Sequence, residues 1–203
     1  MKKKILFIVN VDWFFFSHRL PIAIEAKKKG FEVHIATSFV SKKKELSELG
    51  FYLHELRSCR KKTGLRETFL YLLDIFFLIK HVSPSIVHLI TIKPILVGSL
   101  VLKFFSKIYI VISISGLGYV FSSKGFFPKF RRFLVTNSYK LLLRNKKQKI
   151  IVQNTSDLAF LKKILKINDD GFIFIPGSGV DLNLYKPKPF KNNEIVFLFG
   201  NCK

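Results

Sequence analysis

The sequence predicts one α/β domain built on a doubly wound parallel sheet. Short apolar runs alternate with segments of helical periodicity between Ile5 and Ile175. The apolar runs are nearly continuous, as expected for strands that helices cover on both faces. At 203 residues and 49% hydrophobic, the chain can bury a core of ordinary domain size.

Local signals place the elements of the first half. Residues 5–9 form a continuous apolar strand. A helix is expected to begin between Ser17 and Pro21, because Pro21 suits a first turn, and to end before Gly30. The following elements are expected to be a strand at 31–36, a short helix at 43–49, a strand at 51–56 and a long helix at 65–81.

The second half continues the alternation. Such alternation requires parallel strands joined by right-handed crossovers. The expected elements are strands at 86–90, 108–114, 149–152 and 172–175, and helices at 95–105, 128–144 and 156–165.

The C-terminal region predicts a domain boundary. Residues 176–193 are rich in Pro, Gly and Lys, which is typical of a hinge, and Gly177, Gly179 and Asp181 lie in it. Residues 194–199 then begin another apolar strand, which has no sheet partners left in the sequence. We therefore expect a domain at 1–175, a hinge at 176–193, and residues 194–203 as the first strand of a missing second domain. A frameshift or premature stop explains this more simply than a half-enzyme that recruits a separate donor subunit, because an orphan strand is an unpaired edge.

Charge and cysteine usage restrict the partners and the compartment. The net charge of +22 favours polyanions, yet the sequence has no helix-turn-helix, aromatic RNA-binding or zinc-finger pattern, so no nucleic acid is expected. The two cysteines lie far apart, which fits a reducing, cytoplasmic compartment. No apolar run predicts a transmembrane helix.

An anionic membrane surface is the polyanion that the sequence favours. Segment 126–144 mixes basic residues with phenylalanine and leucine, which is typical of a helix that lies on a membrane, although an ordinary domain helix is an open alternative. If the segment binds membranes, binding to anionic vesicles should weaken with salt and on changing Arg131, Arg132 and Lys140 to Glu. A solvated surface remains the other explanation of the charge.

Candidate site residues follow from the fold class, since ligands of such folds bind beyond the carboxyl ends of the strands. No glycine fingerprint for dinucleotides, P-loop, hydrolase nucleophile elbow or metal-ligand spacing is present, so neither cofactor nor metal is expected. Three of the expected strands supply candidates at this edge. Asp12, Trp13, His18 and Arg19 follow the strand at 5–9, Thr91 and Lys93 follow the strand at 86–90, and Ser115, Gly116 and Gly118 follow the strand at 108–114.

Three motifs of the sequence stand out together: residues 10–21 with 29–34, residues 112–121, and residues 176–181 with 185–187. In this order they resemble motifs of bacterial family 4 glycosyltransferases. The resemblance implies a GT-B fold whose N-terminal domain holds the acceptor and whose C-terminal domain holds a nucleotide sugar. It also implies retention of configuration without a metal. The acceptor would be a polyprenyl-diphosphate-linked or other glycan in O-antigen, capsule or protein glycan assembly, at the inner face of the plasma membrane.

Roles within this half follow from position. Arg19 and Lys93 suit an acceptor phosphate, Trp13 a sugar ring or packing, and His18 either catalysis or a local hydrogen bond. The family pattern after the hinge would continue as Val-Gly-Arg, but here it is Phe-Gly-Asn-Cys-Lys at 199–203. The residues that grip the donor diphosphate would lie beyond Lys203, so the chain alone is expected to be inactive. A non-catalytic membrane- or partner-binding module, or a small-ligand domain, remains an alternative.

Overall fold

The computed structural model describes residues 2–57, 64–117, 126–145 and 147–179, together with Leu182 and Lys186. Side chains of residues 126–131 lie outside the description. The expected strand at 194–199 and most of the hinge also lie outside the described residues.

Seven strands form one fully parallel sheet in the order β3-β2-β1-β4-β5-β6-β7. The α/β, doubly wound prediction is therefore confirmed. The strands are β1 Lys4–Val11, β2 Glu32–Ser38, β3 Tyr52–Glu55, β4 Ile86–Ile90, β5 Tyr109–Ile114, β6 Gln148–Val152 and β7 Phe172–Phe174.

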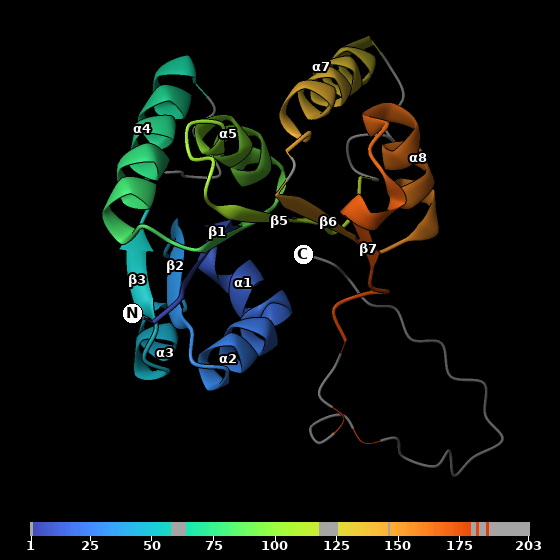
Figure 1. Cartoon of the computed structure of the whole chain (residues 1–203). Coiled ribbons are helices and arrows are strands. Elements are labelled where there is room, and N and C mark those ends of the chain that lie inside the picture. The colour runs from blue at the N-terminus through green and yellow to red at the C-terminus, as the bar shows by residue number, and fades with distance from the viewer. Residues whose placement is uncertain are drawn as a thin grey trace, which may run out of the picture.

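Helices cover the two faces of the sheet unequally (Figure 1). One layer holds α1 Asp12–His18, α2 Leu20–Lys28 and α3 Lys43–Glu48. The other holds α4 Leu65–Val82, α5 Ile92–Leu102, α7 Phe126–Leu142 and α8 Thr155–Leu165. We call these the lower and the upper layer, as Figure 1 shows them.

Alternate residues of the strands pack into two separate hydrophobic cores, one on each face of the sheet. In β1, Leu6 and Ile8 pack with the upper layer, whereas Phe7 packs with Phe15 of the lower layer. All four are fully buried. This two-sided burial explains why the strand reads as an unbroken apolar run.

Close packing in the upper layer depends on Gly98 of α5. A Cβ atom built at this glycine would lie 2.5 Å from Leu89 Cδ2, so a side chain there would force Leu89 or the helix to shift. The first turn of α5 follows directly on the end of β4 at Thr91, where the site lies.

The largest difference from the expected elements lies at the first strand end. The sequence predicts that a helix begins between Ser17 and Pro21, and α2 does begin at Leu20 with Pro21 in its first turn. A separate short helix, α1, was not expected and precedes it. The backbone leaves helical geometry at Arg19, where φ is −130°. Phe15 anchors α1 because its ring is buried and meets Phe7 edge-on at 5.4 Å.

Other boundaries agree within a few residues. α5 begins at Ile92 rather than 95, because Pro94 fits inside a first helical turn. α7 begins and ends two residues earlier than expected, at Phe126 and Leu142.

Two histidines make the stability of the domain depend on pH. Burial, with the charge of Arg19 adding to it, lowers the pKa of His88 to about 3. Burial, with the charges of His34 and His81 adding to it, lowers the pKa of His54 to about 4. His88 is hydrogen-bonded to Ser113 Oγ (2.7 Å), and the His54 ring to His34 (2.9 Å), so both fit their sites as neutral rings.

We expect the free energy of unfolding to fall as the pH drops below about 6.5, the value of histidine in an unfolded chain. The unfolded state takes up protons first, so the stabilisation is complete above that pH and is lost toward the folded values of about 3 and about 4. The slope reaches about 1.4 kcal/mol per pH unit for fully buried His88 and is smaller for half-exposed His54. Urea unfolding at several pH values measures it, and a stability that stays flat between neutral pH and about 4.5 would contradict the assignment.

Candidate functional site

A cavity of about 420 Å³ opens at the carboxyl ends of β1, β4 and β5. The chain winds away from β1 on one side and from β4 on the other, so this is the switch point of the sheet, where folds of this kind bind ligands. The predicted residues Trp13, Thr91, Ser115 and Gly116 all line the cavity. The other lining residues are Asn10, Val11, Phe14, Ile92, Ile95, Ser113, Ile114, Leu117 and Tyr139.

The first turn of α5 forms one wall of this cavity. Ile92 follows Thr91 directly and lines the cavity with it, and the unpaired amides of a helix N-terminus attract anions. Thr91 has a positive φ of 70° and ψ of 155°, an uncommon conformation for a residue other than glycine. Its hydroxyl donates back to the carbonyl of Ile90.

Arg19 is buried next to Ser115 of the cavity wall and is not itself among the cavity-lining residues. Its Nη1 donates to Ser178 Oγ (3.2 Å) and His18 O (2.9 Å), and its Nη2 donates to Ser115 Oγ (2.9 Å). Nε has no hydrogen-bond partner, and within the described ranges no carboxylate forms an ion pair with this guanidinium. Burial lowers the pKa of Arg19. A buried cation held only by neutral oxygens can bind an anion strongly.

Asp12 serves the loop between β2 and α3. Its side chain is fully buried, and Oδ2 accepts hydrogen bonds from the amides of Val40, Ser41 and Lys42 at 2.6 to 2.9 Å. Oδ1 accepts from its neighbour Trp13 N at 2.8 Å. Burial alone would raise the pKa of Asp12, but these four amides outweigh it and lower the pKa. Both oxygens are thus already engaged, which assigns Asp12 a loop-holding role; substrate contact by its carboxylate stays a prediction.

Trp13 and His18 lie on opposite ends of α1. Trp13 is 41% exposed at the cavity wall, where an indole ring can stack against a sugar. His18 stacks on Phe14 at 4.3 Å, and its Nδ1 lies 2.6 Å from Ser17 Oγ. His18 is not among the cavity-lining residues. Its geometry shows the local hydrogen bond, and a catalytic role stays a prediction.

Lys93 points toward α4 rather than into the cavity. Its Nζ lies 4.9 Å from the ring centre of Tyr71, which is buried in the upper layer. Burial lowers the pKa of Lys93, and the charge of Glu67 partly offsets this. The prediction of a phosphate contact by Lys93 therefore has no support from its position.

The hinge begins against the strand ends. Gly177 and Gly179 have positive φ angles of 71° and 72°, which glycine adopts readily. Gln153 Nε2, just after β6, donates to Gly177 O (3.0 Å) and to Ser178 Oγ (3.3 Å). Ser178 thus lies between Gln153 and Arg19, and ties the start of the hinge to the site. Gly118 and Asp181 lie outside the described residues.

Gly116 and Leu117 shape the end of β5. Gly116 has a φ of 152°, and a Cβ atom built there would meet nothing within 4 Å, so the backbone borders open space. The amide of Leu117 donates to Asp157 Oδ2 (3.0 Å) of α8. Asp157 in turn donates its amide to Asn154, the N-cap of α8.

Sequence reasoning missed Tyr139, which reaches the cavity from α7. Its side chain is fully buried, and its hydroxyl has no hydrogen-bond partner among the residues described. Burial, with a contribution from the charge of Asp157, raises the pKa of Tyr139, so the hydroxyl stays protonated. Neither spacing nor composition marks this tyrosine, because α7 is a separate segment that only the fold brings to the site.

In the part of the chain that the structure describes, no three His, Cys, Asp or Glu side chains lie close enough together to hold a metal ion. Over the same residues, no helix combines the length and the apolar character needed to cross a bilayer.

Comparison with known proteins gives a family. Residues 4–154 match the model of the family described as glycosyl transferase 4-like. No curated protein matches the sequence.

Solved structures share the fold at low sequence identity. Sucrose-phosphate synthase from Thermosynechococcus elongatus superposes with a TM-score of 0.68 at 15% identity, over 92% of this chain and 51% of that one. A glycosyltransferase from Rickettsia africae gives a TM-score of 0.61 at 19% identity, over 86% and 43%. UDP-GlcNAc 2-epimerase from Methanocaldococcus jannaschii gives 0.54 at 17% identity, over 87% and 46%. The chain thus spans about half the length of these structures, and its fold alone does not separate transfer from epimerisation.

Proposed function

The chain belongs to the glycosyl transferase 4-like family, and from this premise we propose that it is the acceptor-side domain of a glycosyltransferase that uses a nucleotide sugar. The fold is the Rossmann-like N-terminal half of a GT-B architecture. In such an enzyme the donor sugar is held by a second domain across the hinge at 176–193. This chain would hold and orient the acceptor.

One observation carries the proposal: a cavity at the switch point combines anion-binding groups with a platform for a sugar. The first turn of α5 and Ser115 line the cavity, and buried Arg19, which does not line it, donates from Nη2 to Ser115 Oγ (2.9 Å). Trp13 is 41% exposed at the cavity wall, and the buried hydroxyl of Tyr139 has no hydrogen-bond partner in the described part of the chain. These groups suit a glycan joined to phosphate, in which charge and sugar ring lie next to each other.

The Arg19 hydrogen bonds suggest where a phosphate would bind. The hydroxyl oxygens of Ser115 and Ser178 now accept from the two Nη atoms. Phosphate oxygens are stronger acceptors, and a guanidinium binds two of them side by side. We propose that an acceptor phosphate displaces Ser178 from Arg19, which would remove one of the contacts at the start of the hinge and leave those of Gln153.

The proposed reaction transfers a glycosyl group. A hydroxyl oxygen of the acceptor bonds to the anomeric carbon of the donor while the bond from that carbon to the diphosphate breaks. The departing nucleoside diphosphate takes the hydroxyl proton. Family 4 resemblance supports retention of configuration without a metal, and His18 remains the candidate for a catalytic contact. This chain contributes binding and orientation of the acceptor.

The acceptor that fits best is a polyprenyl-diphosphate-linked glycan of cell-surface polysaccharide assembly, such as O-antigen or capsule. The motifs of residues 10–21 and 176–187 support this class, and the diphosphate would meet Arg19. Such a lipid stays in the membrane, so we place the enzyme on the cytoplasmic side, at the inner face of the plasma membrane.

Trp13 provides the test, because it is the only tryptophan of the chain and lines the cavity. We expect a short-chain prenyl-diphospho-N-acetylglucosamine to change its fluorescence with saturation. Gly116→Val should weaken binding at least about tenfold, because two methyl groups would fill the open space beside the ligand. Gly116→Ala carries the same backbone strain with little filling and serves as the matched control.

Two outcomes would contradict the acceptor-domain proposal. One is the absence of any saturable fluorescence change for the wild-type chain at concentrations where inorganic pyrophosphate binds. The other is equal binding by the wild type and both Gly116 variants, which would put the ligand elsewhere.

A further inference from the structure

Exposed aromatic and aliphatic side chains gather at one end of the upper layer. Phe77 of α4 is 61% exposed, Phe104 after α5 is 76% exposed, and Leu141 of α7 is 69% exposed. Phe76 connects Phe77 with Phe104, since its ring centre lies 5.6 Å from that of Phe77 and 6.5 Å from that of Phe104. Lys103, next to Phe104, contacts Leu141, because its Nζ donates to Leu141 O at 3.0 Å.

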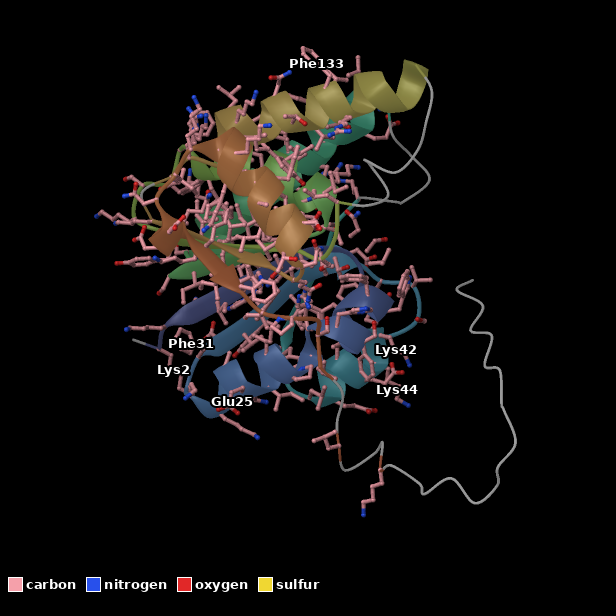
Figure 2. The ribbon with its side chains drawn as sticks, turned by 90° about the vertical axis from the view of Figure 1, so that its right-hand side faces the viewer. Lys2, Glu25, Phe31, Lys42, Lys44 and Phe133 are labelled. Atoms are coloured by element: carbon pink, nitrogen blue, oxygen red, sulfur yellow. The ribbon has the colours of Figure 1, made fainter. Side chains whose placement is uncertain are left out.

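These contacts make the three side chains part of one surface. Lys80, Lys103 and Lys140 lie beside them, each within three residues of an exposed apolar side chain. We call Phe77, Lys80, Lys103, Phe104, Lys140 and Leu141 the basic–aromatic face. Phe133 extends it along α7, and Figure 2 shows Phe133 on the outer side of this helix, away from the sheet.

The lysines of this face differ from those of the lower layer in their partners. Over the described residues, Lys80 and Lys140 have no carboxylate within ion-pair distance, and Lys103 binds only a carbonyl. α5 and α7 contain no Asp or Glu at all. In the described part of the chain, the face thus combines lysines that have no carboxylate partner with exposed apolar area.

Five lysines in or beside the lower-layer helices instead have a carboxylate within ion-pair distance, whereas Lys27 of α2 donates to Leu49 O. Carboxylates on α2, α3 and β3 lie 2.7 to 4.0 Å from their ammonium groups. Figure 2 shows Glu25, Lys42 and Lys44 on this layer, at the opposite end of the molecule from Phe133. The pairs are Lys28 and Lys29 with Glu25, Lys42 with Glu45, Lys43 with Glu55, and Lys44 with Glu48.

We propose that the basic–aromatic face docks on an anionic lipid bilayer, with Phe77, Phe104 and Leu141 entering the headgroup layer. Lipid phosphates would supply the negative charge that the lysines lack within the domain, at about 1 kcal/mol per lysine near the surface. Large exposed apolar side chains cost free energy in water that burial among lipids recovers. The proposal rests on the proposed function only in that a lipid-linked acceptor would hold this domain at the membrane.

The experiment compares two charge reversals of equal size on opposite layers. Lys80→Glu/Lys140→Glu changes the basic–aromatic face, and Lys28→Glu/Lys43→Glu changes the lower layer by the same net charge. Flotation with phosphatidylglycerol–phosphatidylcholine vesicles measures partitioning, and pure phosphatidylcholine vesicles serve as the neutral surface. We expect the upper-layer variant to lose at least about tenfold in partitioning and the lower-layer variant less than about threefold.

A variant with unchanged net charge tests the apolar contribution and does not depend on whether the charge-reversal variant folds. Phe77→Ser/Phe104→Ser keeps the charge, removes exposed rings from outside the core, and should still lose several-fold in partitioning. Thermal unfolding of each variant reports whether it folds, and Lys80→Gln/Lys140→Gln replaces the charge reversal if that variant does not.

Three results would overturn the docking proposal. They are equal losses in the upper-layer and lower-layer variants, equal partitioning into neutral and anionic vesicles, and a concentration-dependent dimer whose interface the upper-layer changes abolish. Binding of the soluble prenyl-diphospho sugar in the cavity is measured separately, so a failure of docking leaves the proposed function standing.

Discussion

Replacing Arg19 with methionine is expected to weaken binding of inorganic pyrophosphate by about tenfold or more while leaving the domain at least as stable as the wild type. The guanidinium is buried without a carboxylate in the described ranges, and its Nε has no partner. Burying a charge costs several kcal/mol, and replacement by an apolar side chain of similar length is often neutral or stabilising. A charge-assisted hydrogen bond contributes about 1.5 to 3 kcal/mol, so the affinity should fall by about tenfold or more.

Calorimetric titration with pyrophosphate and urea unfolding of the same samples measure both effects. Arg144→Met is the matched control, because Arg144 is exposed at the far end of α7 and its Nε binds the carbonyl of Leu165. Unchanged pyrophosphate affinity in Arg19→Met would exclude Arg19 as the anion ligand. A large loss of stability would instead make it a structural residue.

Asp12→Ala is expected to lower the free energy of unfolding by about 2 to 4 kcal/mol, the largest stability effect that we predict. The change removes an acceptor from four backbone amides, three of them in the loop that leads into α3. Amides that lose a buried carboxylate must find water or remain unpaired, and each unpaired group costs about 1 to 3 kcal/mol. Partial hydration of the loop keeps the total below the simple sum.

The Asp12 prediction has a pH dependence of known sign. The folded pKa of Asp12 lies below its ordinary value, so its contribution is complete above about 4 and is lost as the pH falls through the folded pKa. Urea unfolding near neutral pH compares Asp12→Ala with Asp12→Asn, which keeps one acceptor oxygen and should lose about half as much. Asp170→Ala, at an exposed carboxylate, should change stability by less than about 0.5 kcal/mol. A loss in Asp12→Ala as small as that control would contradict the loop-holding role.

The sheet was predictable because its strands are buried on both faces. Such strands read as short apolar runs, and helices between them show their own period, so the order and type of most elements follow from the sequence. The helix α1 was not predicted, since Trp13 to Phe16 reads as an aromatic run and only the packing of Phe15 on Phe7 shows its helical form.

The sequence predicted the edge of the sheet at which the site lies, but not which side chains of the site contact one another. Thr91, Ser115 and Gly116 line one cavity because parallel strands end together. The role of Asp12 depends on amides about thirty positions away, and that of Arg19 on Ser115 and Ser178. Such pairings are set by topology, which spacing along the chain does not encode. The membrane and inactivity predictions, and the domain boundaries, remain to be tested by experiment.

The most direct test of the account is a map of backbone amide chemical shifts during titration with the prenyl-diphospho sugar and, separately, with a UDP-sugar. If this domain holds the acceptor, the prenyl-diphospho sugar should shift the amides of Asn10, Ile92, Ser115 and Gly116 with saturation, and the UDP-sugar should produce no saturable shift there. Saturable shifts of these amides by the UDP-sugar alone would contradict the acceptor-side assignment.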